Sequence, residues 1–101
     1  MRTASRNLCK ELFDLSGWDE ASLHKHPGPE IENAAPAYDL GFLMRKLPDG
    51  YTVLTRFNDG WLASWAERAD AADYAVEENT PEDAVAALAL LLFEKSILQR
   101  Y

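Results

Sequence analysis

The sequence predicts a single α+β domain: a small antiparallel sheet of about three strands with helices packed on both faces, in the order helix, helix, strand, strand, strand, helix. Two observations support this class. Apolar residues recur every three to four positions near both ends of the chain, which is the period of a helix. The middle of the chain holds runs rich in Val, Thr and aromatic residues, separated by turn residues, which is typical of strands. The length of 101 residues fits one domain.

The first helix is expected over residues 3–16. Leucines at helical spacing mark its apolar face: Leu8, Leu12 and Leu15. Gly17 suits the left-handed residue that often follows a helix. The single cysteine, Cys9, lies on the same apolar face, where a cysteine is usually a small buried hydrophobic residue rather than a reactive one.

Residues 19–37 form the least regular stretch, with three prolines and no clear period, so we expect an irregular loop. This stretch contains both histidines of the chain, His24 and His26. An H-x-H pair can bind a metal, but a structural zinc site needs four ligands and no second cluster of Cys or His completes one. We therefore expect surface histidines, no metal and no cofactor. A short second helix is expected over residues 38–47, ended by Pro48.

Two runs typical of strands, residues 51–57 and 61–68, flank Asn58-Asp59-Gly60 and predict a β-hairpin. Residues 73–78 alternate apolar and acidic side chains and predict a third strand. The acidic side chains suit an edge strand, because charge at an edge discourages unwanted pairing. Both faces of the hairpin are partly apolar, and for this reason we expect both to be covered.

The hairpin register decides which side chains share a face. A two-residue Asp-Gly turn would pair Phe57 with Leu62 and separate the tryptophans of the hairpin from Phe57. A three-residue loop with Gly60 at positive φ would pair Phe57 with Trp61. That register gathers large apolar side chains on one face: Val53, Phe57, Trp61 and Trp65. Burial of this face favours the three-residue loop.

The last helix has the clearest start in the chain, because Thr80 can cap it and Pro81 suits its first position. Its body, residues 84–98, is apolar nearly all round and must be buried on most sides. One stripe is expected to pack on the hairpin: Val85, Leu88 and Leu92. A second set lies too far round the helix to reach the hairpin: Leu90, Phe93 and Ile97. Either the first two helices cover this second set, or it is an exposed apolar interface and the protein is a homodimer.

Acidic residues dominate one segment of a chain whose formal net charge is −7. Within residues 67–83 a single base, Arg68, accompanies seven acids: Glu67, Asp70, Asp73, Glu77, Glu78, Glu82 and Asp83. Their field repels phosphate backbones and anionic lipid, so we expect neither nucleic acid nor a membrane as a partner. The segment is either a solvated rim that keeps the protein soluble or a surface for a basic partner. Mimicry of nucleic acid would require all seven acids on one exposed surface.

Motifs that carry chemistry are missing from the sequence, which has no P-loop, no Rossmann glycine pattern, no nucleophile elbow and no H-E-x-x-H. The longest apolar run, residues 84–93, is shorter than the roughly 20 residues that a membrane span needs. The lone cysteine cannot form an internal disulfide, and the first residues lack the apolar segment of a signal peptide. We therefore expect a cytoplasmic protein.

Three blocks of the sequence resemble a known family: LCKELFDLSGW at residues 8–18, YDLGFLMRKLP at residues 38–48 and TPEDAVAALALLLFEKSIL at residues 80–98. They are similar to small phage and prophage proteins of unknown function that are grouped as a phage ABA-sandwich domain. The resemblance implies helices on both sides of a sheet and an origin in a phage or prophage. It implies no catalytic residue.

Together these features predict a non-enzymatic phage or prophage accessory protein that contacts an unidentified protein partner in the cytoplasm of the host bacterium. An alternative is an acidic nucleic-acid mimic that inhibits a host DNA- or RNA-binding protein. A small enzyme is a third hypothesis, and it would need a concave pocket with convergent polar groups.

Overall fold

The computed structural model describes residues 2–19, 24–25 and 36–99. Within these ranges the protein is α+β, with three helices and a three-stranded antiparallel sheet, and the predicted class is confirmed. In chain order the elements are α1 (Arg6–Ser16), β1 (His24–Lys25), β2 (Pro36–Ala37), α2 (Leu40–Lys46), β3 (Tyr51–Phe57), β4 (Gly60–Ala66), β5 (Tyr74–Glu78) and α3 (Pro81–Glu94). The short strands β1 and β2 both lie within residues 19–37, where the sequence predicts an irregular loop, and they pair antiparallel.

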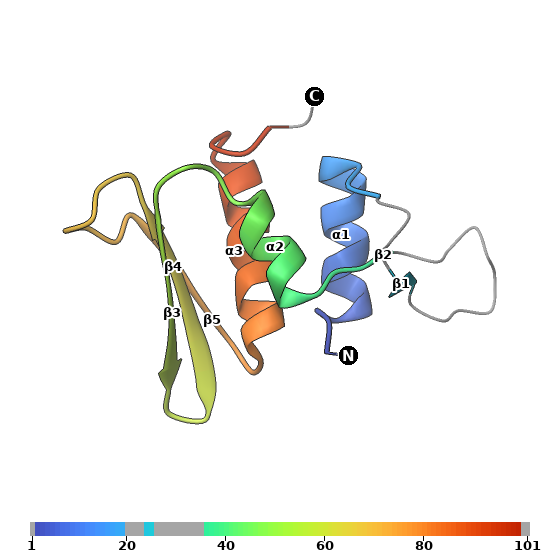
Figure 1. Ribbon diagram of the computed structural model, residues 1–101, viewed down its shortest axis with the longest axis horizontal. Coiled ribbons are helices and arrows are strands. Elements are labelled where there is room, and N and C mark those ends of the chain that lie inside the picture. The colour runs from blue at the N-terminus through green and yellow to red at the C-terminus, as the bar shows by residue number, and fades with distance from the viewer. Residues whose placement is uncertain (1, 20–23, 26–35, 100–101) are drawn as a thin grey trace.

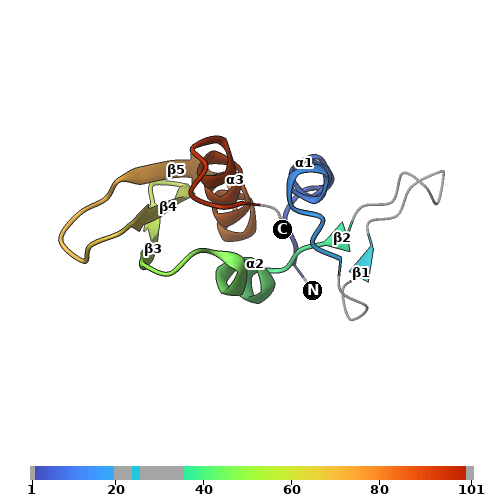
Figure 2. The ribbon, with the colours of Figure 1, turned by 90° about the horizontal axis from the view of Figure 1, so that it is seen from above.

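All three helices lie on one side of the sheet, so the expectation of helices on both faces is wrong (Figures 1 and 2). Helix α3 packs directly on β4 and β5, and both α1 and α2 pack on α3. This position explains why α3 is apolar nearly all round: the sheet and two helices surround it. We call the sheet face toward the helices the inner face and the opposite face the outer face. No described element covers the outer face.

The hairpin closes through a two-residue turn, Asn58-Asp59, so Phe57 pairs with Gly60 and Val53 pairs with Ser64. The predicted three-residue loop is therefore wrong. Asn58, not Gly60, has the positive φ, at 55°. Gly60 is required for a different reason, since a Cβ there would lie 2.9 Å from the backbone oxygen of Glu78.

This register also corrects the predicted faces of the hairpin. Trp61 and Trp65 share the inner face with residues that pair across the sheet: Leu54, Ala63, Tyr74 and Val76. Val53 and Phe57 lie on the outer face instead. Because side chains alternate along a strand, a change of one residue in register exchanges the two faces. In the observed register both tryptophans share the inner face with the apolar residues of β5. Reasoning from the hairpin alone does not take β5 into account.

Helix α3 begins where the sequence predicts, whereas α1 begins at Arg6, three residues later than expected. The Ser5 side chain caps α1 and accepts a hydrogen bond from the Leu8 N–H, and Gly17 follows the helix at φ 71°. The Thr80 hydroxyl caps α3 and accepts from the Asp83 N–H at 3.1 Å. Both caps satisfy amides that have no partner within the helix.

Helix α3 ends at Glu94, four residues before its predicted end. Ser96 adopts φ 62°, and the Ile97 N–H donates to the Leu92 carbonyl at 2.9 Å while the Ser96 N–H donates to the Phe93 carbonyl at 3.0 Å. These two bonds form a Schellman motif. The sequence contains no glycine that would indicate this helix end, because a serine occupies the left-handed position that glycine usually fills.

A single cluster of buried side chains joins the helices to the inner face. Val85, Leu88 and Leu92, the stripe that was expected to pack on the hairpin, are fully buried, and their helix packs on β4 of the hairpin and on β5. The aromatic rings of Tyr38 and Phe42 stack in this cluster with centroids 5.1 Å apart. None of the helices in the described ranges is long and apolar enough to cross a membrane.

Candidate interaction surfaces

The structure does not place the seven predicted acidic residues on one exposed surface. Glu82 is only 4% exposed. Asp83 is half-buried, and its carboxylate accepts a hydrogen bond from the Ser5 N–H at 2.6 Å, which ties the start of α3 to the start of α1. Asp73 accepts a hydrogen bond from the Glu67 N–H at 3.1 Å and holds the β4–β5 connection. The condition for nucleic-acid mimicry is therefore not met.

The predicted apolar set on α3 and beyond is half-buried and packs against the core: Leu90, Phe93 and Ile97. Trp18, just after α1, covers part of Phe93, and the two ring centroids lie 5.5 Å apart. None of the three belongs to the exposed large hydrophobic residues of the described chain. The sequence left two outcomes open for this set, and partial cover within one chain is the outcome observed.

The outer face of the sheet carries the exposed apolar residues that the sequence analysis missed. Tyr51, Val53 and Phe57 are 53%, 54% and 50% exposed, and all three lie on the outer side of β3. The half-buried Leu62 continues this face on β4, whereas Ala66, at the end of β4, is buried. The alternation of β3 was a visible signal, but the incorrect register assigned Val53 and Phe57 to the buried face.

The two edges of the sheet differ in chemistry. The strand order β3-β4-β5 leaves β3 and β5 at the edges. Strand β5 carries Glu77 and Glu78, and charge of this kind protects an edge from pairing. Strand β3 is seven residues long, contains no proline or acid, and has Arg56 as its single charged residue. By these criteria β3 is an unprotected edge.

The hairpin register identifies which backbone groups of β3 face this edge. The pair that flanks a two-residue turn is hydrogen-bonded, and hydrogen-bonded pairs then alternate along the ladder. Phe57 and Gly60 flank the turn, so the odd-numbered residues of β3 bond to β4. The N–H and C=O groups of Thr52, Leu54 and Arg56 therefore point away from β4, toward the open edge.

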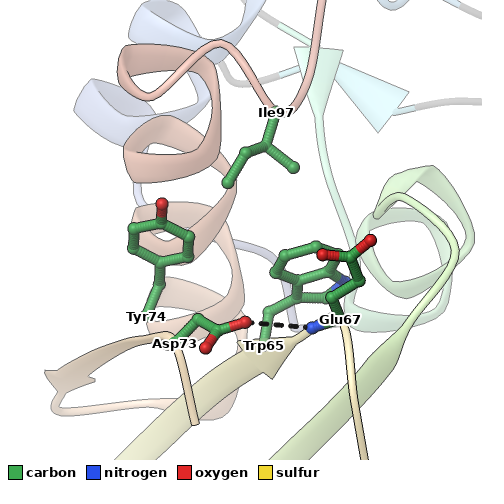
Figure 3. A pocket seen from close by; sticks show the side chains of 5 residues that line it. All are labelled: Trp65, Glu67, Asp73, Tyr74 and Ile97. Carbon is green, nitrogen blue, oxygen red and sulfur yellow. Dashed lines mark hydrogen bonds between the residues drawn. The ribbon is translucent and has the colours of Figure 1, made fainter. Parts of the chain in front are cut away.

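A hollow of about 530 Å³ lies where β4 ends and β5 begins, below the turn that follows α3 (Figure 3). Five side chains line it: Trp65, Glu67, Asp73, Tyr74 and Ile97. The Trp65 and Tyr74 rings lie 6.4 Å apart and nearly parallel, and the Trp65 Nε1–H donates to the Pro48 carbonyl at 3.2 Å. The aromatic rings and two carboxylates suit a positively charged group.

Two buried groups have shifted pKa values. Burial raises the pKa of the Cys9 thiol, which donates to the Ala4 carbonyl at 3.4 Å and accepts from the Tyr38 N–H at 3.5 Å. Burial also raises the pKa of Tyr38, whose hydroxyl donates to the Trp18 carbonyl at 2.6 Å. Both groups stay protonated. Their hydrogen bonds link Tyr38, which precedes α2, to Cys9 in α1 and to Trp18 just after α1.

The described residues contain no group of three or more His, Cys, Asp or Glu side chains that could hold a metal ion. Of the two histidines considered as metal ligands, His26 and the side chain of His24 lie outside the described part. Comparisons with protein-family models, curated proteins and solved structures found no match for this chain.

Proposed function

We propose that this chain is a non-enzymatic protein that acts by binding another protein through the outer face of its sheet. The observation that carries this proposal is the row of half-exposed side chains on β3: Tyr51, Val53 and Phe57. A small domain gains free energy by covering such residues, and this face has no described helix over it. Exposed apolar groups gathered on one face are typical of interaction sites.

The chemistry of the outer face favours a protein as the ligand. Two of its three exposed large residues are aromatic, and aromatic side chains are enriched at the centres of protein interfaces. The polar side chains among them are small, such as Thr55 and Ser64, and desolvating a small hydroxyl costs less than desolvating a charge. Glu77 on β5 is the charged residue of this face within the described sheet.

A non-enzymatic role agrees with the two groups whose pKa values are shifted. An activated nucleophilic cysteine needs a lowered pKa and access to substrate, whereas Cys9 is fully buried and its pKa is raised. Tyr38 is buried as well and bonds to the backbone. Both groups therefore support the fold rather than a reaction.

An origin in a phage or prophage and action in the host cytoplasm are part of the proposal. The three sequence blocks that resemble phage ABA-sandwich proteins and the lone cysteine support them. The genes that flank this one in its source genome test the origin. Phage genes on both sides are expected, and an operon of unrelated metabolic genes would contradict it. The nucleic-acid mimic is not favoured, because Glu82 is buried and Asp83 holds the N-terminus of α1.

Site-specific photo-crosslinking in the cells that make the protein tests the contact. A photoreactive residue at Phe57 samples the outer face, and the same residue at Lys10, exposed on α1, is the matched control. We expect position 57 to form a covalent adduct with a second, different protein, and position 10 to form none. Val53→Glu should remove the adduct, because it places a charge on the same face. Equal adducts at both positions, or none at position 57, would refute the proposal.

A further inference from the structure

We propose that β3 pairs antiparallel with β3 of a second copy of this chain, about a two-fold axis at Leu54. The two three-stranded sheets then form one continuous sheet, with the helices of both copies on the same side. This contact uses the backbone edge of β3 and places no further layer over the outer face. It is therefore separate from the partner contact proposed above.

The backbone geometry fits this pairing. About an axis at Leu54, Leu54 lies opposite Leu54 of the second copy, and Thr52 lies opposite Arg56 of the second copy. These are the residues whose N–H and C=O groups point toward the open edge. The outward-pointing N–H and C=O groups of one copy therefore lie opposite those of the other copy and can form hydrogen bonds along the strand. A shift of the axis by half a residue would bring them against groups that already bond to β4.

The side chains of β3 are complementary to themselves in the same register. Tyr51 lies opposite Phe57 of the second copy, and Val53 lies opposite Thr55 of the second copy. Aromatic and β-branched cross-strand pairs of this kind stabilise an antiparallel ladder. The charged residue of the strand, Arg56, meets Thr52, so no like charges lie directly opposite each other. The strand Y-T-V-L-T-R-F thus meets its own reversed sequence without an unfavourable side-chain pair, which favours a second copy as the partner strand.

The distribution of charge permits two acidic chains to meet at this edge. Residues 38–66, which run from before α2 to the end of β4, contain three acids and three bases. The acidic segment begins after β4 and includes β5, the opposite edge of the sheet. The two copies would therefore meet at edges that carry no acid, with their acidic segments on the far sides. The glutamates of β5 discourage the alternative pairing through that edge.

Opposite charges at position 52 test the pairing in the full chain. In the proposed register, Thr52→Lys creates two symmetric like-charge pairs with Arg56, while Thr52→Glu creates two opposite-charge pairs. Sedimentation equilibrium should show a wild-type dimer of twice the 11.4 kDa chain mass. We expect the dissociation constant to rise about fivefold for Thr52→Lys and to fall by a similar factor for Thr52→Glu. The double variant Thr52→Lys with Arg56→Glu should restore the dimer.

Each other outcome overturns the pairing. A wild-type chain that stays monomeric up to its highest soluble concentration refutes it. So does a dimer that responds equally to Lys and Glu at position 52. If Ser64→Glu, which places a charge on the outer face of β4 and away from the edge of β3, breaks such a dimer, the copies meet through their outer faces. Circular dichroism confirms that each variant is folded. In the dimer Phe57 lies opposite Tyr51 of the second copy, so a photo-crosslink from position 57 to the chain itself reports the dimer, whereas a crosslink to a different protein reports the partner contact. The mass of the adduct distinguishes these two outcomes, so the two proposals fail separately.

Discussion

Replacing Gly50 with alanine should destabilise the protein strongly, although the residue itself is exposed. Gly50 lies in the connection between α2 and β3 and has φ 150°, a conformation that residues with a side chain rarely adopt. A Cβ there would lie 2.7 Å from the Ala66 carbonyl oxygen and 2.7 Å from Nε1 of Trp65. Both distances are shorter than any normal van der Waals contact.

The two neighbours of this Cβ cannot easily move. The Ala66 oxygen belongs to the backbone of β4, and Trp65 is 6% exposed with its Nε1–H bonded to the Pro48 carbonyl at 3.2 Å. Forcing an extra methyl group into packed surroundings costs about 1–3 kcal/mol. Backbone strain at this φ adds about 1 kcal/mol or more. The free energy of unfolding should therefore fall by about 2–4 kcal/mol.

Urea unfolding followed by tryptophan fluorescence measures this loss, and the midpoint should fall by roughly 1–2 M. Gly41→Ala is the matched control. Gly41 is exposed on α2, and its added Cβ would meet side-chain atoms of Arg45 and Asp39 at 3.4 and 3.5 Å. That variant should gain about 0.5–1 kcal/mol, because alanine favours the helix. A Gly50→Ala midpoint at or above that of the wild type would show that the connection before β3 can move away from Trp65.

Two further predictions concern a helix cap and alkaline pH. Thr80→Ala should lower the free energy of unfolding by about 1 kcal/mol, because the Asp83 N–H loses its hydroxyl partner, and Thr80→Ser should retain most of it in the same urea assay. Burial raises the pKa values of Cys9 and Tyr38 in the folded state, so above about pH 8.5 the unfolded chain binds fewer protons than the folded one, and stability should fall as pH rises. Cys9→Ala should make this fall shallower between about pH 8.5 and 10, and an unchanged slope would show that the thiol does not contribute.

Signals that act within a few residues were readable from the sequence. The start of α3 depends on one hydrogen bond between Thr80 and the third residue after it, and the end of α1 depends on the conformation of Gly17. Composition, turn residues and alternation were enough to locate the three strands of the sheet. The end of α3 at Glu94 was not predicted, because Ser96 and not a glycine adopts the left-handed conformation after it.

Features that depend on distant segments could not be read locally. The hairpin could bury either of two faces, and the choice depends on β5 and α3, which bring Tyr74, Val76 and the apolar helix to the side of Trp61 and Trp65. The candidate surface followed from that choice. A register that buries Val53 and Phe57 hides the exposed row on β3, and the apolar surface that the sequence indicates is then the set on the last helix: Leu90, Phe93 and Ile97. The sequence shows that residues 67–83 are rich in acids, but it does not show that they form one exposed surface. Asp83, for example, accepts a hydrogen bond from the Ser5 N–H within the fold.

The central position of α3 has a consequence for how the protein folds. Every other layer packs on α3, yet it follows them all in the sequence of described elements. An isolated hairpin and single short helices are at best marginally stable in water. The earlier elements therefore have no stable partner until α3 is present, and contact between α1 and α3 must close a loop that spans most of the chain. This order of elements favours all-or-none unfolding and refolding over the stepwise growth of a folded core.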